Sequence, residues 1–386
     1  MTADSITQLA QAESGVYGDW HPAMMSWVWH WLNKVYFGPA GMLILHNLCF
    51  FGGLACLARA CRLGALGRAA LVVLFSAVPS VFTQLGVVWK DVGLSTSYFL
   101  GASWLLLASR RGRPLWPALV PLFYGTAVRH NSLPALLPLT VLFAAAARPS
   151  WKTAASGLAL GLALWALAFG CNRGLASGLR EHMGAQLESF DLAGISLCAG
   201  EPRYPPGLYA EEPTLEKIRE RYHPGDWRAA LMFHPRADLP GFDRTLSRWW
   251  LRQVLAHPGC YLRHRLEAFK YALNLDGGDP TIPICSRVFP NPWGIQKTRG
   301  AAFQTLYAGL WSIRNSLWFK TFPYYLACGL ALILALLRRD LALGCLAASG
   351  FLYFLSYAVA GFGGDDFRYG YWTVLASAVS AVLLLA

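Results

Sequence analysis

The amino-acid sequence predicts an all-α polytopic membrane protein. Of its 386 residues, 55% are hydrophobic and 14% are charged, which is more apolar surface than a soluble core could bury. Because lipid cannot satisfy backbone polar groups, segments that cross the bilayer in such a chain must be helices. Nine apolar stretches approach the ~20 residues that a crossing needs. They lie near residues 40–58, 67–88, 93–109, 115–128, 133–147, 154–171, 321–337, 341–360 and 370–386.

The stretches fall into two groups separated by a long polar insert. We expect about six transmembrane helices in 39–171 and about three in 321–386, with a mainly helical extracytoplasmic domain in 172–320. The stretch 1–38 reads as a first extracytoplasmic loop, in which Met24 to Phe37 resembles a helix lying in the membrane interface.

Two helices are predicted inside the insert. One covers 242–256, with Asp243 as its cap, and a second covers about 261–273 after the His257-Pro258-Gly259 breaker. Both are amphipathic and rich in cations and aromatic residues. They fit a membrane interface or a packed pair with a solvated basic face.

The charges on the short loops predict the orientation. Ten cations mark one face: Arg59, Arg62, Arg68, Arg110, Arg111, Arg113, Arg148, Lys152, Arg338 and Arg339. The opposite set holds only Lys34, Lys90, Arg129 and Arg368, so the cation-rich face should be cytoplasmic. Outside the insert, only Asp340 among the acidic residues falls on that face. The net charge of +12 therefore does not predict nucleic-acid binding, because exported basic residues would meet lipid phosphates instead.

The cysteines show no metal-binding pattern, since neither Cys-x-x-Cys nor His-x-x-x-His spacing occurs. Cys198, Cys260 and Cys285 lie in the insert, where an oxidising compartment could join two of them. We expect Cys198 to pair with Cys285.

Four polar groups lie on the outer face beside membrane spans, where ionisable residues are costly and usually functional. The first contains Thr2-Ala3-Asp4-Ser5, followed by Asp19 and His21 in an Asp-Trp-His-Pro sequence, and the second is Trp89-Lys90-Asp91. The third is Arg129-His130-Asn131, and the fourth is a glycine-led turn with Asp365, Asp366, Arg368 and Tyr369.

Structural interpretations of these groups remain open. Asp4 could cap a helix, and Asp19 with His21 could form a turn before a helix that begins with proline. Lys90 and Asp91 could neutralise each other. Snorkelling to the interface would explain Arg129 alone, but not the cation, ring and amide together.

The order of these groups on one face resembles the GT-C superfamily of membrane glycosyltransferases. The chain looks closest to bacterial members related to protein O-mannosyltransferases and aminoarabinose transferases, and a His-Pro-x-x-Tyr-Leu-x-x-Arg motif at 257–265 also recurs there. The resemblance implies a polyprenyl-phosphate-sugar donor and a lipid, glycan or protein acceptor. It also implies a bacterial inner-membrane protein whose active site faces the periplasm or the exterior. In that family a transmembrane helix precedes the first acidic residue, so we expect the natural chain to begin upstream of this sequence. The alternative is that the first span translocates the short N-terminal segment.

The resemblance also implies roles for single residues. Asp4 matches the acidic residue that serves as catalytic base or orients the acceptor, and Asp19 and His21 match the second polar cluster of that loop. Lys90 and Arg129 would hold the lipid phosphate, with Arg368 as a further candidate. The remaining substrate-binding candidates are Asp91, His130, Asn131, Asp365, Asp366 and Tyr369.

The residue types alone fit such a transfer. A lipid phosphate leaves readily when cations neutralise its developing charge, and a carboxylate can deprotonate an acceptor hydroxyl or amine. No cofactor is required; a divalent cation on Asp4, Asp19, Asp365 or Asp366 remains an open alternative. A transporter or flippase for an anionic substrate is the main rival, although mid-span polar groups and repeated halves, typical of transporters, are not evident. A non-catalytic scaffold would not need four charged turns on one face.

Overall fold

The computed structural model is helical throughout its regular secondary structure. It describes residues 1–61, 63–147, 152–178, 182–226, 233, 236, 239–276, 288–360, 364 and 366–385. Isolated bridges also occur in these ranges, among them one between Tyr17 and Ala176, but no longer strand does. The predicted all-α class is therefore confirmed.

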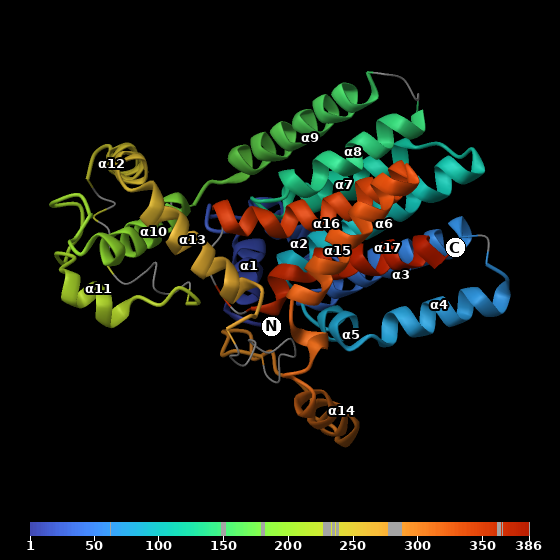
Figure 1. Ribbon diagram of the computed structural model, residues 1–386. Helices are drawn as coiled ribbons and strands as arrows, with labels where there is room; N and C mark the ends of the chain where they lie inside the picture. Colours follow the sequence, from blue (N-terminus) through green and yellow to red (C-terminus); the bar gives the residue numbers. More distant parts are fainter. Residues whose placement is uncertain are drawn as a thin grey trace. The chain divides into compact units, whose positions relative to one another are not determined.

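Five helices are long and apolar enough to cross a membrane, and they indicate an integral membrane protein (Figure 1). They are α3 (Ala40–Ala60), α6 (Lys90–Arg111), α9 (Thr153–Leu175), α16 (Leu341–Ala360) and α17 (Tyr371–Leu385), the last counted together with the short helix η4 (Phe367–Gly370). A sixth span arises if α4 (Ala65–Ala77) and α5 (Pro79–Leu85) act as one, but this pair is bent by 77°. The bend follows from Pro79, because a proline disfavours helical geometry in the residue before it. Val78 accordingly has φ −56° and ψ 121°.

The remaining predicted spans are shorter. Helices α8 (Leu133–Ala147) and α15 (Phe322–Arg338) are apolar but have 15 and 17 residues. The short apolar stretch predicted at 115–128 forms η1 (Trp116–Ala118) and the nine-residue α7 (Leu119–Ala127). At about 1.5 Å per residue, α7 covers less than half of the hydrocarbon layer.

Close packing between spans depends on glycine. A Cβ added to Gly53 of α3 would lie 2.8 Å from the Phe99 ring of α6. On α9, a Cβ at Gly157 would lie 2.5 Å from the Cα of Val141 in α8. Small residues let helix backbones approach closely in a membrane, where apolar surface alone gives little driving force for association.

Residues 1–33 form two helices that precede the first span. Helix α1 (Ala3–Ser14) packs against α2 (Ala23–Asn33), and a hydrogen bond of 3.0 Å from Ser26 Oγ to Gln11 Oε1 joins them. Helix α9 holds the first turn of α2 in place, because Asn172 Oδ1 accepts a 2.9 Å hydrogen bond from Met24 N–H. The same Asn172 donates through Nδ2 to the Ala127 carbonyl at the end of α7.

The chain divides into two compact units. The first contains Met1–Leu179, Pro280–Phe354 and Phe367–Ala386, and the second contains Arg180–Asp279 and Leu355–Asp366. Helices α10 (Met183–Ala199), α11 (Leu215–Arg221), α12 (Phe242–Ala256) and α13 (Pro258–Ala272) belong to the second unit.

The two helices expected in the insert are present in this second unit. The first has the predicted bounds, whereas the second begins at Pro258, because proline is well suited to the first turn of a helix. The prediction that Asp243 caps α12 is wrong. Gly241 occupies the cap position, and Asp243 instead pairs with His182 at 2.6 Å.

The disulfide joins Cys198 of α10 to Cys260 of α13. The predicted pairing of Cys198 with Cys285 is therefore wrong, and Cys285 lies outside the described residues. Spacing along the chain did not reveal that α10 and α13 lie side by side.

A buried ion-pair network links the helices of the second unit. It consists of Asp191, Tyr222, Trp250, His264 and Arg265. Asp191 accepts three hydrogen bonds: from Arg265 Nη2 at 2.7 Å, from Trp250 Nε1 at 2.9 Å and from His264 Nε2 at 3.0 Å. His264 Nδ1 meets the Tyr222 hydroxyl at 2.6 Å. Arg265 is the last residue of the motif at 257–265, and its ion pair with Asp191 gives this arginine a structural role.

Candidate functional site

The site is built around the first turn of α1, which is fastened to the loop before α6. Ser5 Oγ donates to the Val88 carbonyl at 2.7 Å, and Trp89 Nε1 donates to Thr2 Oγ1 at 2.8 Å. These bonds fix the position of Asp4, whose side chain remains 30% exposed. The alternative that Asp4 itself caps the helix is wrong, because the cap residue is Thr2.

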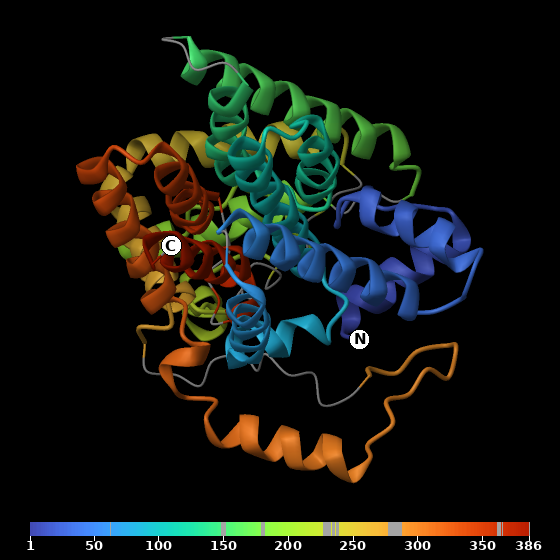
Figure 2. The same ribbon diagram turned by 90° about the vertical axis from the view of Figure 1, so that its right-hand side faces the viewer.

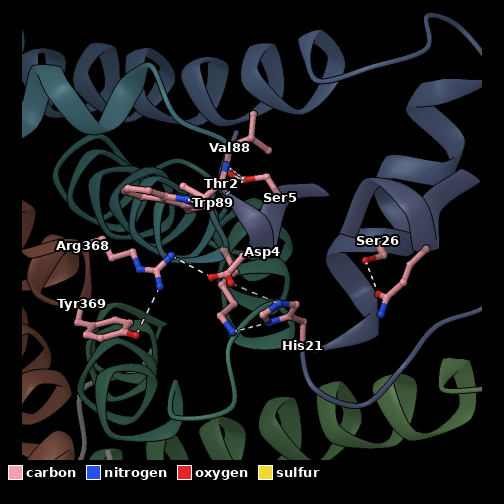
Figure 3. Close-up of polar contacts among 11 residues, drawn as sticks. Thr2, Asp4, Ser5, His21, Ser26, Val88, Trp89, Arg368 and Tyr369 are labelled. Carbon is pink, nitrogen blue, oxygen red and sulfur yellow. Dashed lines mark hydrogen bonds and ion pairs between the residues drawn. The ribbon is translucent and has the colours of Figure 1, made fainter. Parts of the chain in front are cut away.

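Arg368 joins the last span to Asp4. Its Nη1 lies 2.9 Å from Asp4 Oδ2, and its Nη2 donates to the Tyr369 hydroxyl at 3.5 Å (Figure 3). The guanidinium carbon also lies 5.0 Å from the Trp89 ring centroid and 5.2 Å from that of Tyr369. A guanidinium held between two rings and a carboxylate is oriented as well as charged.

His21 and Lys90 approach Asp4 from another side. Lys90 Nζ lies 2.7 Å from His21 Nδ1, and His21 Nε2 lies 3.9 Å from Asp4 Oδ1. If Lys90 donates to Nδ1, the proton of a neutral imidazole is on Nε2 and points to Asp4. The geometry therefore favours this tautomer.

Asp91 and Arg129 form a second, more enclosed pair. Arg129 Nη2 lies 3.0 Å from Asp91 Oδ1, with the two side chains 9% and 1% exposed. The Arg129 guanidinium carbon lies 5.2 Å from the Tyr369 ring centroid. Tyr369 thus contacts both arginines, and it connects the Asp91–Arg129 pair with the Asp4–Arg368 pair.

The outer charged cluster comprises Asp4, His21, Lys90, Asp91, Arg129, Arg368 and Tyr369. Its three basic side chains, Lys90, Arg129 and Arg368, face two carboxylates. Desolvation raises the pKa of Asp4, but Arg368, Lys90 and His21 together outweigh it, and the pKa falls to about 2. A surplus of positive charge surrounds an ionised carboxylate.

His21 is held neutral. Burial, and then the charge of Lys90, lower its pKa well below the ordinary value of 6.5, although Asp4 acts in the opposite direction. A neutral His21 accepts a hydrogen bond from Lys90 through Nδ1 and directs its Nε2 proton toward Asp4, and it adds no charge to the cluster.

The structure brings together some of the predicted site residues but not all of them. Of the twelve candidates, the seven members of the outer charged cluster come from α1, the following loop, α6, the loop after α7 and η4. His130 is exposed and Asn131 half-buried beside them in sequence. Asp19 influences the cluster's neighbour His130, whose pKa is lowered to about 4 by desolvation and then by Lys90 and Arg129, while Asp19 opposes this. The exposure of His130 weakens this effect relative to the one on His21.

The two carboxylates of the glycine-led turn are not assigned to the cluster. Asp365 lies outside the described residues, and Asp366 belongs to the second compact unit. In the described part of the chain, no three His, Cys, Asp or Glu side chains gather as a metal site.

Thr2 and Ser5, which flank Asp4 in the first polar group, hold α1 in place. One positioning residue was missed by the sequence interpretation: Asn172, which ties the start of α2 to the end of α7. A single amide in the apolar stretch 154–175 is a signal that could have pointed to Asn172.

An apolar cavity of about 590 Å³ lies elsewhere in the first unit. It is lined by residues of α8, α9, α15 and α16, and none of the cluster residues contributes to it.

Comparison of the chain with known protein families, with curated proteins and with solved structures finds no match.

Proposed function

We propose that this protein is a membrane glycosyltransferase of the GT-C type. In this proposal it moves a sugar from a polyprenyl-phosphate donor to an acceptor on the extracytoplasmic face, in a bacterial inner membrane. The observation that carries the proposal is the outer charged cluster, in which basic groups outnumber carboxylates beside a 30% exposed Asp4. A phosphate-linked lipid supplies the missing negative charge and suits a chain with several membrane-length helices.

The basic groups are arranged for a phosphate. Arg368 presents a fork of N–H donors, one of which already holds a carboxylate oxygen at 2.9 Å. Lys90 adds a compact donor through Nζ, and Arg129 contributes a second guanidinium that also contacts the Tyr369 ring. Such donors neutralise the charge that develops on a departing phosphate.

Asp4 is ionised in the free protein, but a pKa of about 2 makes it a weak base. Donor phosphate would compete with Asp4 for Arg368 and Lys90. Because these cations lower the pKa while desolvation raises it, losing them makes Asp4 more basic. Donor binding would therefore activate the base.

The transfer is a single displacement. Asp4 takes the proton of an acceptor hydroxyl or amine, and the acceptor atom forms a bond to the anomeric carbon as the bond from that carbon to the phosphate oxygen breaks. The electron pair leaves on polyprenyl phosphate, where Lys90, Arg129 and Arg368 neutralise it. One displacement inverts the anomeric centre and needs no second nucleophilic carboxylate.

The test separates binding from chemistry. We expect the protein in lipid nanodiscs to bind decaprenyl phosphate, and Arg368→Gln to weaken this binding, measured by native mass spectrometry. Arg339→Gln, at an exposed cation of the opposite charge set, is the matched control. Transfer from a panel of polyprenyl-phosphate sugars should fall about 10²-fold in Asp4→Asn while binding persists. Equal binding by the wild type and Arg368→Gln would contradict the proposed phosphate site.

A transporter or flippase is the second candidate, and one observation favours it. The α4 and α5 pair is bent by 77°, and discontinuous helices are typical of transporters. Vesicles containing the protein would then move a fluorescent polyprenyl phosphate between leaflets without cleaving any sugar from a donor. Transfer without such movement supports the enzyme.

A further inference from the structure

Helix α14 (Ala301–Ser312) is an apolar helix with no buried residue. It lies in the first unit, between the described segment 288–300 and α15. Leu306 is 46% exposed and Trp311 is 37% exposed. An apolar helix that buries none of its side chains within the described part of the chain needs another apolar environment.

The apolar residues of α14 occupy one face. They recur at the i, i+3, i+4, i+7 and i+8 positions, which place five large side chains on one side of a helix: Phe303, Leu306, Tyr307, Leu310 and Trp311. The opposite side carries small or uncharged polar residues, among them Thr305, Ala308 and Ser312. No charged residue lies within the helix.

Aromatic rings form a ladder along this face, and cations contact both of its ends. Phe303 and Tyr307 stack with centroids 6.0 Å apart, and Tyr307 and Trp311 with centroids 5.7 Å apart. Lys297 Nζ lies 3.9 Å from the Phe303 ring centroid, and Arg314 Cζ lies 4.7 Å from that of Trp311. Lys297 lies before the N-terminal end of α14, where the helix dipole is positive and repels a cation. The dipole therefore does not explain the position of Lys297.

Helix α14 is the orange helix seen lengthwise at the lower edge of Figure 2, and it precedes α15 in the chain. The chain then continues through the 61% exposed Leu317 and the 46% exposed Trp318 into α15, which begins at Phe322.

We propose that α14 is an interfacial helix that inserts its aromatic face into one leaflet of the membrane, with Lys297 and Arg314 at lipid phosphates. Rings that stack at the level of the headgroups, flanked by cations, are typical of this environment. Helix α14 is followed in the chain by α15, an apolar helix of 17 residues, and the lack of charge within α14 suits partial insertion. The inference does not depend on glycosyl transfer.

The test uses photo-crosslinking of the full chain in nanodiscs of phosphatidylethanolamine and phosphatidylglycerol. p-Benzoylphenylalanine replaces Leu306 on the apolar face, or Thr305 on the opposite face as the matched control. We expect lipid adducts at position 306 at least about tenfold more abundant than at position 305, measured by mass spectrometry. Adducts from position 306 to another part of the chain, or to a second copy, would overturn the proposal, as would equal lipid labelling at both positions.

Hydrogen exchange of the unmodified protein gives an independent measurement, because it needs no substitution. Backbone amides of 301–312 should exchange more slowly in nanodiscs than those of the exposed segment 295–300. Equally fast exchange in both segments would also overturn the proposal, since an inserted helix excludes water from its hydrogen bonds.

Discussion

Two groups of charged side chains in this molecule use similar residues for different ends. The buried ion-pair network and the outer charged cluster each combine aspartate, histidine, arginine and an aromatic hydroxyl. In the network, Asp191 is fully buried and accepts hydrogen bonds from three donors, so one arginine and one carboxylate balance. In the cluster, Asp4 is 30% exposed, and three basic groups face two carboxylates.

The two groups differ in whether their charges are fully paired within the protein. A buried charge must have its partners within the protein, because leaving it unpaired costs several kcal/mol. A partly exposed group with surplus charge around it can exchange a protein partner for a ligand. The network is therefore expected to act on folding, and the cluster on binding and reaction.

The first prediction tests the network. Asp191→Ala leaves Arg265, which is 3% exposed, without its carboxylate. We expect a loss of about 3–5 kcal/mol in the stability of the second unit, measured by thermal unfolding and by proteolysis between 180 and 279. Asp243→Ala is the control, because its side chain is 56% exposed and its removal should cost far less. Similar losses in the two variants would mean that the network is no more than a surface pair.

The second prediction tests the cluster by removing the charge of its partly exposed aspartate. Asp4→Asn should lower sugar transfer about 10²-fold, at the low end of what a general base supplies, while the unfolding temperature changes far less than in Asp191→Ala. Initial rates and thermal unfolding of the same preparations check this. A large loss of stability with unchanged transfer per folded molecule would place Asp4 in the structural class with Asp191.

The third prediction concerns the geometry of Arg368. Lysine keeps the charge but cannot place one donor on Asp4 and another on Tyr369 while stacking on Trp89. Arg368→Lys should therefore weaken decaprenyl phosphate binding about tenfold, whereas Arg339→Lys should leave it unchanged. Full binding by Arg368→Lys would show that charge alone matters at this position.

The smallest expected effect is a pH dependence of stability. The pKa of Asp4 is about 2 in the folded protein and 3.8 ordinarily. Its ionised form thus stabilises the fold above about pH 3.8, and the stabilisation is lost as the pH falls toward 2. The difference in unfolding temperature between wild type and Asp4→Asn should shrink across this interval. A constant difference would argue against the ion pair with Arg368.

Much of the local structure was accessible from the sequence. Periodicity and length predicted the helix at Phe242–Ala256 with the observed bounds, and the positions of α3, α6, α9 and α16 closely. These features depend on neighbours a few residues apart. The apolar stretch at 115–128 was less informative, because composition did not show that it divides into η1, which contains Pro117, and the short α7. Val78 shows how a residue before a proline breaks a continuous apolar stretch.

The site was predictable as a set of residue types but not as a set of contacts. Asp4, Lys90, Arg129 and Arg368 were selected because ionisable groups beside spans are costly. Their pairing joins residues as far as 364 positions apart, and no short-range pattern carries that information. The same reason explains why Cys198 was matched with Cys285 and not with Cys260.

By itself, the sequence determined that this chain is helical, that it carries several membrane-length apolar segments, and that charged turns interrupt them. Composition and spacing are sufficient for these conclusions, because the bilayer admits few backbone structures. Only the tertiary structure decided which charges are satisfied within the protein and which remain partly open. That distinction depends on burial and on distances between remote segments, and it separates Asp191 from Asp4.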